Sequence, residues 1–201
     1  GNPKAQSLFQ TIGAVGSVLG LLVIPILSKW FNKKIIYQIS LIATIIGYVL
    51  MYIFGPILKM TIALDIAYII SSTGIAAMFV GQTVFLADIV DYGEFKNAER
   101  NESITFSMKG FLQKMAYTIQ TLVLFGGLAM MNYNEQITSA TKQINNSTKT
   151  GIGIICFAVP PVLILLSLIV FTAKFKLHGD LADQVHDHIV AKRANEAETN
   201  E

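Results

Sequence analysis

The sequence is poor in charge and in cysteine, and each shortage excludes a class of protein. Only 14% of its 201 residues are charged and 53% are hydrophobic, which is too apolar for a soluble domain of this size. The fifteen Lys and Arg residues stand at the ends of apolar runs and form no basic stripe, so nucleic acid is not an expected partner. The single cysteine, Cys156, cannot form an intrachain disulfide. A lipid bilayer is therefore the expected environment of the chain.

The sequence also lacks the residue groups of an enzyme, a metalloprotein or a channel. No nucleophile, base and orienting group gather at one depth of a predicted membrane span, and no cluster of metal ligands occurs. No ring-forming selectivity motif is present either. We therefore expect no catalytic residues, no bound metal and no cofactor.

Five apolar runs are each long enough to cross about 30 Å of hydrocarbon, which takes about 20 helical residues. A helix satisfies its own backbone hydrogen bonds, as lipid requires, so the predicted fold class is an all-α membrane protein. The predicted spans are residues 9–27, 35–58, 60–87, 104–131 and 151–173. They form a transmembrane bundle of residues 1–176, and an amphipathic and polar tail of residues 177–201 follows. A hairpin around Gly55-Pro56 is expected between the second and third spans.

The distribution of the cations predicts the orientation of these spans. Four of the fifteen fall on one side and Lys114 lies inside the membrane. The other ten fall on the opposite side: Lys29, Lys33, Lys34, Lys96, Arg100, Lys109, Lys174, Lys176, Lys192 and Arg193. By the positive-inside rule the ten mark the cytoplasm, so the chain starts outside and its C-terminus is cytoplasmic. Five spans with an external start are natural if at least one span precedes Gly1, so we expect a fragment of a longer multi-pass protein of the plasma membrane.

Lys114 is the ionisable residue that lies deepest in the predicted membrane. It stands ten residues into the fourth span, roughly 15 Å from the start at 1.5 Å per residue, which is too deep for its side chain to reach the interface. A cation at this depth indicates a functional site, with a purely structural ion pair as the alternative. No other span offers a carboxylate at this depth, so we expect its partner outside this chain. Lys109 is only five residues into the span and can snorkel to the interface.

Three acids at the end of the third span form the second polar feature. Asp88, Asp91 and Glu94 recur every three residues, so they share one side if the helix continues past the span. Composition alone favours a solvated helix end. Acids at this position are unusual, however, and they suit salt bridges to basic groups on a facing helix. Such charge pairs at the mouth of a cavity can act as a two-state gate.

Smaller polar and small-residue patterns lie within the other apolar runs. Phe79 and Gln82 are one helical turn apart and present a stacking face and an amide on nearly the same side, although each alone is typical of a packed core. Gly16 and Gly20 have the small-xxx-small spacing that favours close helix packing.

The run from Ala87 to Lys96 gives these patterns a family context. Together with residues farther along the chain it closely resembles the signature of the glycoside-pentoside-hexuronide:cation symporters, the melibiose permease-like family of the major facilitator superfamily. Those further residues are Arg100, Glu102, Ser103, Phe106, Ser107 and Lys114. The resemblance extends over nearly the whole chain. It implies a fold of two six-helix halves with the sugar site between them, in which this chain matches helices eight to twelve of the C-terminal half.

The resemblance also implies roles for single residues. Lys114 falls on the family's mid-membrane lysine, close to both the coupling cation and the sugar. Phe79 falls on an aromatic position that helps to hold the sugar, and Gln82 follows at the matching spacing. Four residues fall on the cytoplasmic gate: Asp88, Asp91, Glu94 and Arg100.

The function that the resemblance implies is secondary active transport by alternating access. A glycoside, pentoside or hexuronide and a cation, Na⁺ or H⁺, bind together near the membrane midplane while the two halves rock about them. The expected partners are this sugar, the coupling cation, the bilayer and an N-terminal half of the transporter. Lys109 and Gly110 stand where a permease of the family carries Gln and Thr beside its sugar, so the resemblance does not identify the sugar. The alternative function is a membrane sensor or assembly domain that kept the fold without transport.

Overall fold

The computed structural model describes residues 3–58, 60–97, 99–130, 146–175 and 179–199, and the regular secondary structure in these ranges is helical. Two short π-helical turns, η1 (Ile53–Ile57) and η2 (Ile154–Ala158), continue longer helices. The α-helices are α1 (Pro3–Leu27), α2 (Lys33–Tyr52), α3 (Thr61–Asn97), α4 (Glu102–Met130), α6 (Asn146–Gly153), α7 (Val159–Lys174) and α8 (Asp180–Thr199).

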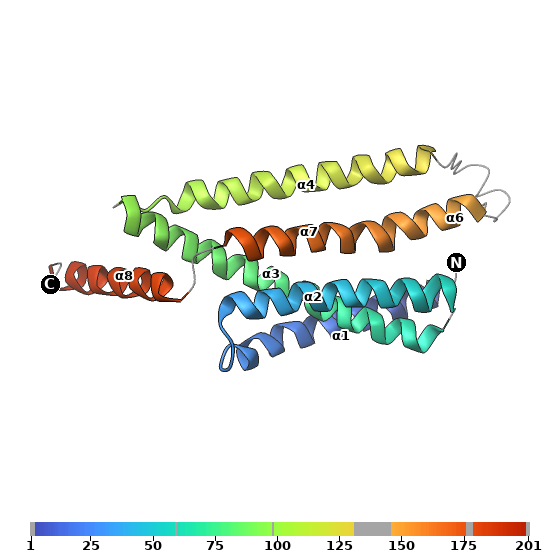
Figure 1. Ribbon diagram of the computed structural model, residues 1–201, viewed down its shortest axis with the longest axis horizontal. Helices are drawn as coiled ribbons and strands as arrows, with labels where there is room; N and C mark the ends of the chain where they lie inside the picture. Colours follow the sequence, from blue (N-terminus) through green and yellow to red (C-terminus); the bar gives the residue numbers. More distant parts are fainter. Residues whose placement is uncertain (1–2, 59, 98, 131–145, 176–178, 200–201) are drawn as a thin grey trace.

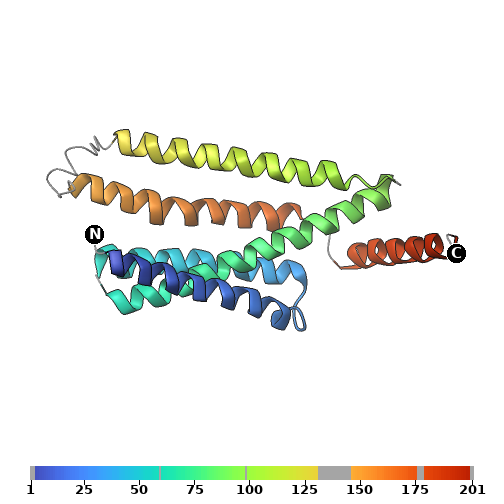
Figure 2. The same cartoon turned by 180° about the vertical axis from the view of Figure 1, so that it is seen from behind.

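The long helices lie side by side and alternate in direction (Figure 1). The α1–α2 connection, the α3–α4 connection and α8 all lie toward one end of the molecule. The start of α1, the α2–α3 connection and the start of α6 lie at the other end, as the reverse view also shows (Figure 2). We call the end that contains α8 the charged end, because it carries Lys33, Asp88 and Arg100. This alternation is the arrangement that successive membrane crossings require.

Each of the five predicted spans corresponds to a helix in the described ranges. Four helical stretches are both long and apolar enough to cross a membrane: Gln6–Leu27, Lys33–Gly55, Thr61–Asn97 and Thr150–Lys174. The fifth helix, α4, has 29 residues and is therefore also long enough. Polar side chains such as Lys109, Gln113 and Lys114 make it less apolar than the other four. The expectation of an all-α membrane protein is confirmed.

The helix ends differ from the apolar runs in two places. Helix α3 continues to Asn97, ten residues past the predicted end of its span, so Asp88, Asp91 and Glu94 do lie on a continuing helix. Gly55 lies inside η1, where the amide of Met60 donates to the carbonyl of Phe54 at 2.9 Å. The chain therefore reverses after residue 57, because a widened helical turn accommodates the Gly-Pro pair instead of ending at it.

Helix α3 packs closely against α1 and α2 because small residues lie at both crossings. A Cβ atom on Gly47 would lie 2.6 Å from the Cα atom of Ser71, and one on Gly16 would lie 2.8 Å from the carbonyl oxygen of Ile69. The hydroxyl of Thr73 donates to the carbonyl oxygen of Gly16 at 2.9 Å. The close approach expected from the glycines of the first span is therefore confirmed, and it lets the helix backbones touch.

Aromatic side chains form the core that joins α2, α3 and α7. Phe85 meets Tyr37 edge to face at a centroid distance of 5.3 Å, and it lies 5.3 Å from Phe171 and 4.7 Å from Phe175. Leu41 packs beside them and is almost fully buried. Edge-to-face and tilted aromatic pairs are favourable beyond the area they bury. We call Tyr37, Phe85, Phe171 and Phe175 the aromatic cluster.

Candidate functional site

Salt bridges converge on the three acids at the end of α3. Asp88 accepts hydrogen bonds from the ammonium group of Lys33 at 2.9 and 3.1 Å. Glu94 accepts a hydrogen bond from Lys192 at 2.6 Å and another from Arg100 at 3.2 Å. Asp88 and Glu94 therefore each have a basic partner within this chain.

Asp91 and Glu102 complete the group. The guanidinium of Arg100 lies 3.6 Å from Asp91 and 3.0 Å from Glu102, and that of Arg193 lies 3.5 Å from Asp91. We call the whole group the ionic cluster: Lys33, Asp88, Asp91, Glu94, Arg100, Glu102, Lys192 and Arg193. Its acids come mainly from α3, whereas its cations come from the start of α2, the α3–α4 connection and α8.

Burial differs strongly within the ionic cluster. The Glu94 side chain is 9% exposed, whereas those of Arg100 and Lys33 are 42% and 63% exposed. Hydrogen bonds to Glu102 first, and then to Glu94, raise the pKa of Arg100 above its ordinary value. Arg100 therefore keeps its positive charge in the cluster.

Helix α8 brings two of the four cations to the cluster. Val185 and Ile189 are buried, where α8 contacts α3, and His188 meets Phe95 edge to face at 5.1 Å. These contacts hold Lys192 and Arg193 over the end of α3. Helix α8 is therefore one wall of the cluster.

A pocket of about 820 Å³ lies between α3, α4 and α7, next to the ionic cluster along α3. We call it the central pocket. Phe79 and Gln82 line it, and the aromatic cluster forms one of its walls. The volume is typical of a site for a small molecule. The structure therefore brings together two of the three residues predicted to bind the substrate.

Lys109 also lines the central pocket. From the sequence alone, its side chain was expected only to reach toward the membrane interface. Gln113, one turn further along α4, and Gln120, three turns along, line the same wall. Among the described residues that line the pocket, Lys109 is the only one that carries a charge. Lys109 reaches the pocket because this face of α4 is turned toward α3.

Lys114, the third predicted residue, lies on another side of α4. It follows Lys109 by five residues, which at 100° per residue turns it about 140° away from that face. Its side chain is exposed and does not line the central pocket. In the described part of the chain no salt bridge forms to Lys114. Its predicted contact with a sugar or a coupling cation stays a prediction.

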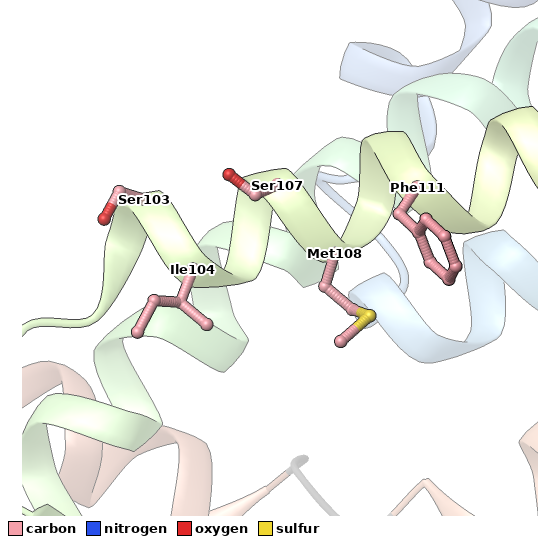
Figure 3. Close-up of a pocket in the computed structure, with 5 residues that line it drawn as sticks. All are labelled: Ser103, Ile104, Ser107, Met108 and Phe111. Carbon is pink, nitrogen blue, oxygen red and sulfur yellow. The ribbon is translucent and has the colours of Figure 1, made fainter.

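A shallow hollow of about 380 Å³ lies along the first turns of α4 (Figure 3). Ser103 and Ser107 lie on the opposite side of the ribbon from Ile104 and Met108, and the ring of Phe111 stands beside them. Lys114 follows Phe111 by three residues and Ser107 by seven, so it continues the row of the serines. This row faces away from the central pocket and forms a second polar face of α4.

Of the basic partners of the three acids, the sequence and its family resemblance grouped only Arg100 with them. Lys33 belongs to the basic connection that is predicted on the same side of the membrane as the acids. This shared side was the signal from which the pairing of Lys33 with an acid could have been predicted. Lys192 is 98 residues away from Glu94 in the chain, and no local pattern links the two. The acid-rich end of α3 was thus predicted from the sequence, but its salt bridge to the tail was not.

Residues 1–178 match the family described as MFS/sugar transport protein. An uncharacterized symporter, YjmB of Bacillus subtilis (strain 168), is 28% identical over 197 residues, which are 94% of this chain and 39% of that protein. The lactose permease of Leuconostoc lactis is 27% identical over 96% of this chain and 30% of the permease. The raffinose carrier protein of Pediococcus pentosaceus is 25% identical over 96% of this chain and 28% of the carrier.

These similarities have two consequences. The chain spans between 28% and 39% of the length of these relatives, so it corresponds to only a part of each. The family and the names of the relatives are those of transporters and not of enzymes, and the membrane-length helices agree with a multi-pass membrane protein. The resemblance to melibiose permease-like symporters is confirmed at the level of the family. Because the match covers most of its length, the chain belongs to the MFS/sugar transport protein family.

Proposed function

We propose that this chain is the C-terminal part of a secondary active transporter that carries a sugar or glycoside together with a cation, Na⁺ or H⁺. Membership of a sugar-transport family supports the proposal, as do relatives named lactose permease and raffinose carrier protein. The observation that carries it is the ionic cluster, which lies directly beside the central pocket at one end of α3.

Alternating access needs a closure at one end of the binding cavity that forms and breaks as the transporter cycles. The salt bridges of the ionic cluster join α3 to the start of α2, to the α3–α4 connection and to α8. Most of these side chains are partly exposed, and exposed pairs contribute only about 0–1 kcal/mol each. Such a network can close the cavity and still be broken by a small difference in binding energy. We propose that Asp88, Asp91, Glu94 and Arg100 form this gate.

The charged end is the cytoplasmic side in this proposal, because the cation-rich connections lie there. The start of α1 is then external, and the α8 tail is cytoplasmic. A preceding segment of the same transporter supplies the other half of the sugar site. The gate thus controls access between the central pocket and the cytoplasm.

Lys114 is the proposed coupling residue. Its ammonium group lies at mid-membrane depth on the second polar face of α4, where it needs water or a carboxylate. We propose that a carboxylate of the preceding half compensates Lys114 and also binds the coupling cation. Loading of the cation then changes the electrostatic balance at Lys114 and links occupancy to conformation. Phe79 and Gln82 contact the sugar in the central pocket, and direct contact between Lys114 and the sugar is a separate prediction.

The proposal is tested with the complete reading frame that contains this chain, reconstituted in proteoliposomes. Sugar uptake is measured with an imposed Na⁺ gradient, with an imposed H⁺ gradient and with neither. We expect accumulation with one of the gradients, and we expect Lys114→Ala to abolish it while membrane insertion is retained. Lys174→Ala, the same change at the end of α7, is the matched control and should accumulate normally.

Two outcomes would contradict this assignment. Normal accumulation by the Lys114→Ala protein would remove the coupling role. Binding of sugar by the unaltered protein without accumulation under either gradient would favour a sensor over a transporter.

A further inference from the structure

We infer that the connection between α1 and α2 binds the headgroup of an anionic phospholipid through Lys29 and Trp30, and that this binding favours the closed state of the gate. The lipid contact is argued from the surface of this chain alone, whereas its link to the gate rests on the proposed function. The inference adds a partner and a means of regulation to that function.

Trp30 is exposed although it lies in an ordered turn. Its backbone amide donates to the carbonyl of Leu27 at 3.0 Å, and the amide of Phe31 donates to the same carbonyl at 2.9 Å. Trp30 is 81% exposed and Phe31 is 45% exposed. The turn thus holds two aromatic side chains at the surface, where water gives their apolar area no stabilisation. A partner that covers an indole is therefore expected at this place.

The position of Trp30 along the chain identifies the kind of partner. The membrane-length stretch Gln6–Leu27 ends three residues before it, about 4.5 Å away at 1.5 Å per residue. The connection itself lies at the charged end (Figure 1). A residue just past the hydrocarbon is at the level of the lipid headgroups, where the apolar body of an indole and its N–H donor both find partners. A phospholipid interface therefore suits Trp30 better than either water or hydrocarbon.

The charge of the connection favours an anionic headgroup over a zwitterionic one. Residues 28–34 include three lysines and neither Asp nor Glu. Lys33 and Lys34 already have partners within the chain, at 2.9 and 3.0 Å. Lys29 is exposed, and in the described part of the chain no salt bridge forms to it. Because it is adjacent to Trp30, one headgroup can accept hydrogen bonds from the ammonium group and from the indole.

The same short segment also reaches the gate. Lys33 follows Trp30 by three residues and donates two hydrogen bonds to Asp88, at 2.9 and 3.1 Å. The structure combines this salt bridge and an exposed Trp30 in one arrangement. A ligand shifts a protein toward the conformation that it binds best, so a headgroup held by Lys29 and Trp30 keeps the start of α2 over Asp88. Opening of the gate separates Lys33 from Asp88, moves the connection and weakens the lipid contact.

The first experiment measures the lipid contact without any transport. The complete reading frame is placed in nanodiscs of one part phosphatidylglycerol to three parts phosphatidylcholine, with the same composition in both leaflets. One or the other lipid is brominated near its headgroup, at equal bromine content, so that it quenches a neighbouring indole. Trp30 is the only tryptophan of this chain, and its signal is the difference in fluorescence between the unaltered protein and Trp30→Phe.

We expect phosphatidylglycerol to quench the Trp30 signal about fivefold more strongly than phosphatidylcholine, because one lysine beside an anionic surface favours binding by about that factor. Lys29→Gln should remove the preference. Lys29→Arg should keep it, which shows that the altered connection still folds. Lys96→Gln, a change of another exposed lysine at the charged end, is the matched control and should also keep it.

The second experiment tests the link to the gate. Leu86, which lines the central pocket, is replaced by Cys in protein that carries Cys156→Ser. A membrane-impermeant maleimide is added at the charged end, in vesicles of phosphatidylcholine with or without one quarter phosphatidylglycerol. The anionic lipid should slow the labelling about twofold or more, since it stabilises the closed arrangement, and Lys29→Gln should remove this dependence.

Other results would overturn the inference in distinguishable ways. Equal quenching by the two lipids, or a preference that survives Lys29→Gln, would refute the anionic headgroup. Quenching of Trp30 by neither lipid would show that protein covers it, such as the preceding half of the transporter. A preference for phosphatidylglycerol without any change in labelling would refute the regulation of the gate. A failure to accumulate sugar would count against the proposed function and not against the lipid contact, because the fluorescence does not depend on transport.

Discussion

Replacing Glu94 by Gln removes one negative charge from the ionic cluster and keeps the size of the side chain. Glu94 is the most buried acid of the cluster, with 9% of its side chain exposed, and it links α3 to two other elements. Lys192 of α8 donates to one carboxylate oxygen at 2.6 Å, and Arg100 of the α3–α4 connection donates to the other at 3.2 Å. The substitution should therefore weaken the closed state of the proposed gate more than neutralising any other single acid of the cluster.

The size of the effect follows from the exposure of the two partners. Breaking a fully buried ion pair costs about 3–5 kcal/mol, whereas an exposed pair contributes about 0–1 kcal/mol. Glu94 is buried, but Lys192 and Arg100 are 36% and 42% exposed, so water still stabilises both cations after the change. An intermediate value of about 1–2 kcal/mol follows, and it shifts the ratio of open to closed molecules by a factor of about 5–30.

Labelling of a pocket cysteine measures this ratio in the complete reading frame. Cys156 is replaced by Ser, and Leu86, which lines the central pocket, is replaced by Cys. A membrane-impermeant maleimide is then added at the charged end of the protein, in vesicles of the matching orientation. Glu94→Gln should increase the labelling rate about tenfold.

Glu102→Gln is the matched control for this measurement. Glu102 also binds Arg100, at 3.0 Å, but its side chain is 52% exposed, so its loss should change the rate by no more than about twofold. An unchanged rate in Glu94→Gln would refute the gate as described here. So would an equal increase in both variants, because burial would then have no influence on the strength of the closure.

Two further predictions concern the packing that supports the site. Gly47→Ala places a methyl group 2.6 Å from the backbone of Ser71 and should destabilise the folded protein by about 1–3 kcal/mol in detergent unfolding assays, whereas Gly126→Ala, with open space around it, should have little effect. Phe85→Ala removes the centre of the aromatic cluster and should cost about 3–5 kcal/mol in the same assay, whereas Phe106→Ala, at an exposed position, should cost much less. Equal losses within either pair would contradict the packing described.

The helices themselves could be predicted because lipid leaves few alternatives for a long apolar run. Their ends were less predictable. Hydropathy falls at Asp88, but the backbone of α3 continues as a helix to Asn97, because charged residues end an apolar run without ending a helix. The reversal after η1 was also hard to place. Gly55 and Pro56 predict a turn at their own position, but both lie inside a π-helical turn, and the chain reverses after it.

The members of the candidate site were predictable to different degrees. The three acids were found because their spacing of three is a local property of one helix. Their partners Lys192 and Arg193 were not, since contacts between α8 and α3 depend on tertiary packing. The place of Lys109 depends on the rotation of α4 about its own axis, and a helix with polar residues on both faces gives no clear signal of that rotation.

The two polar faces of α4 give the strongest argument about what surrounds this helix. One face carries Lys109 and Gln113 and borders the central pocket. The other carries Ser107 and Lys114, and the described chain leaves it exposed. A charged lysine at mid-membrane depth is costly against hydrocarbon, so this second face requires water or protein and not lipid. The proposed preceding half of the transporter meets that requirement, and it would place the coupling cation beside the face of α4 that lies opposite the central pocket. Rotation or tilting of α4 would then move both sites together, which is a physical route from cation binding to sugar transport.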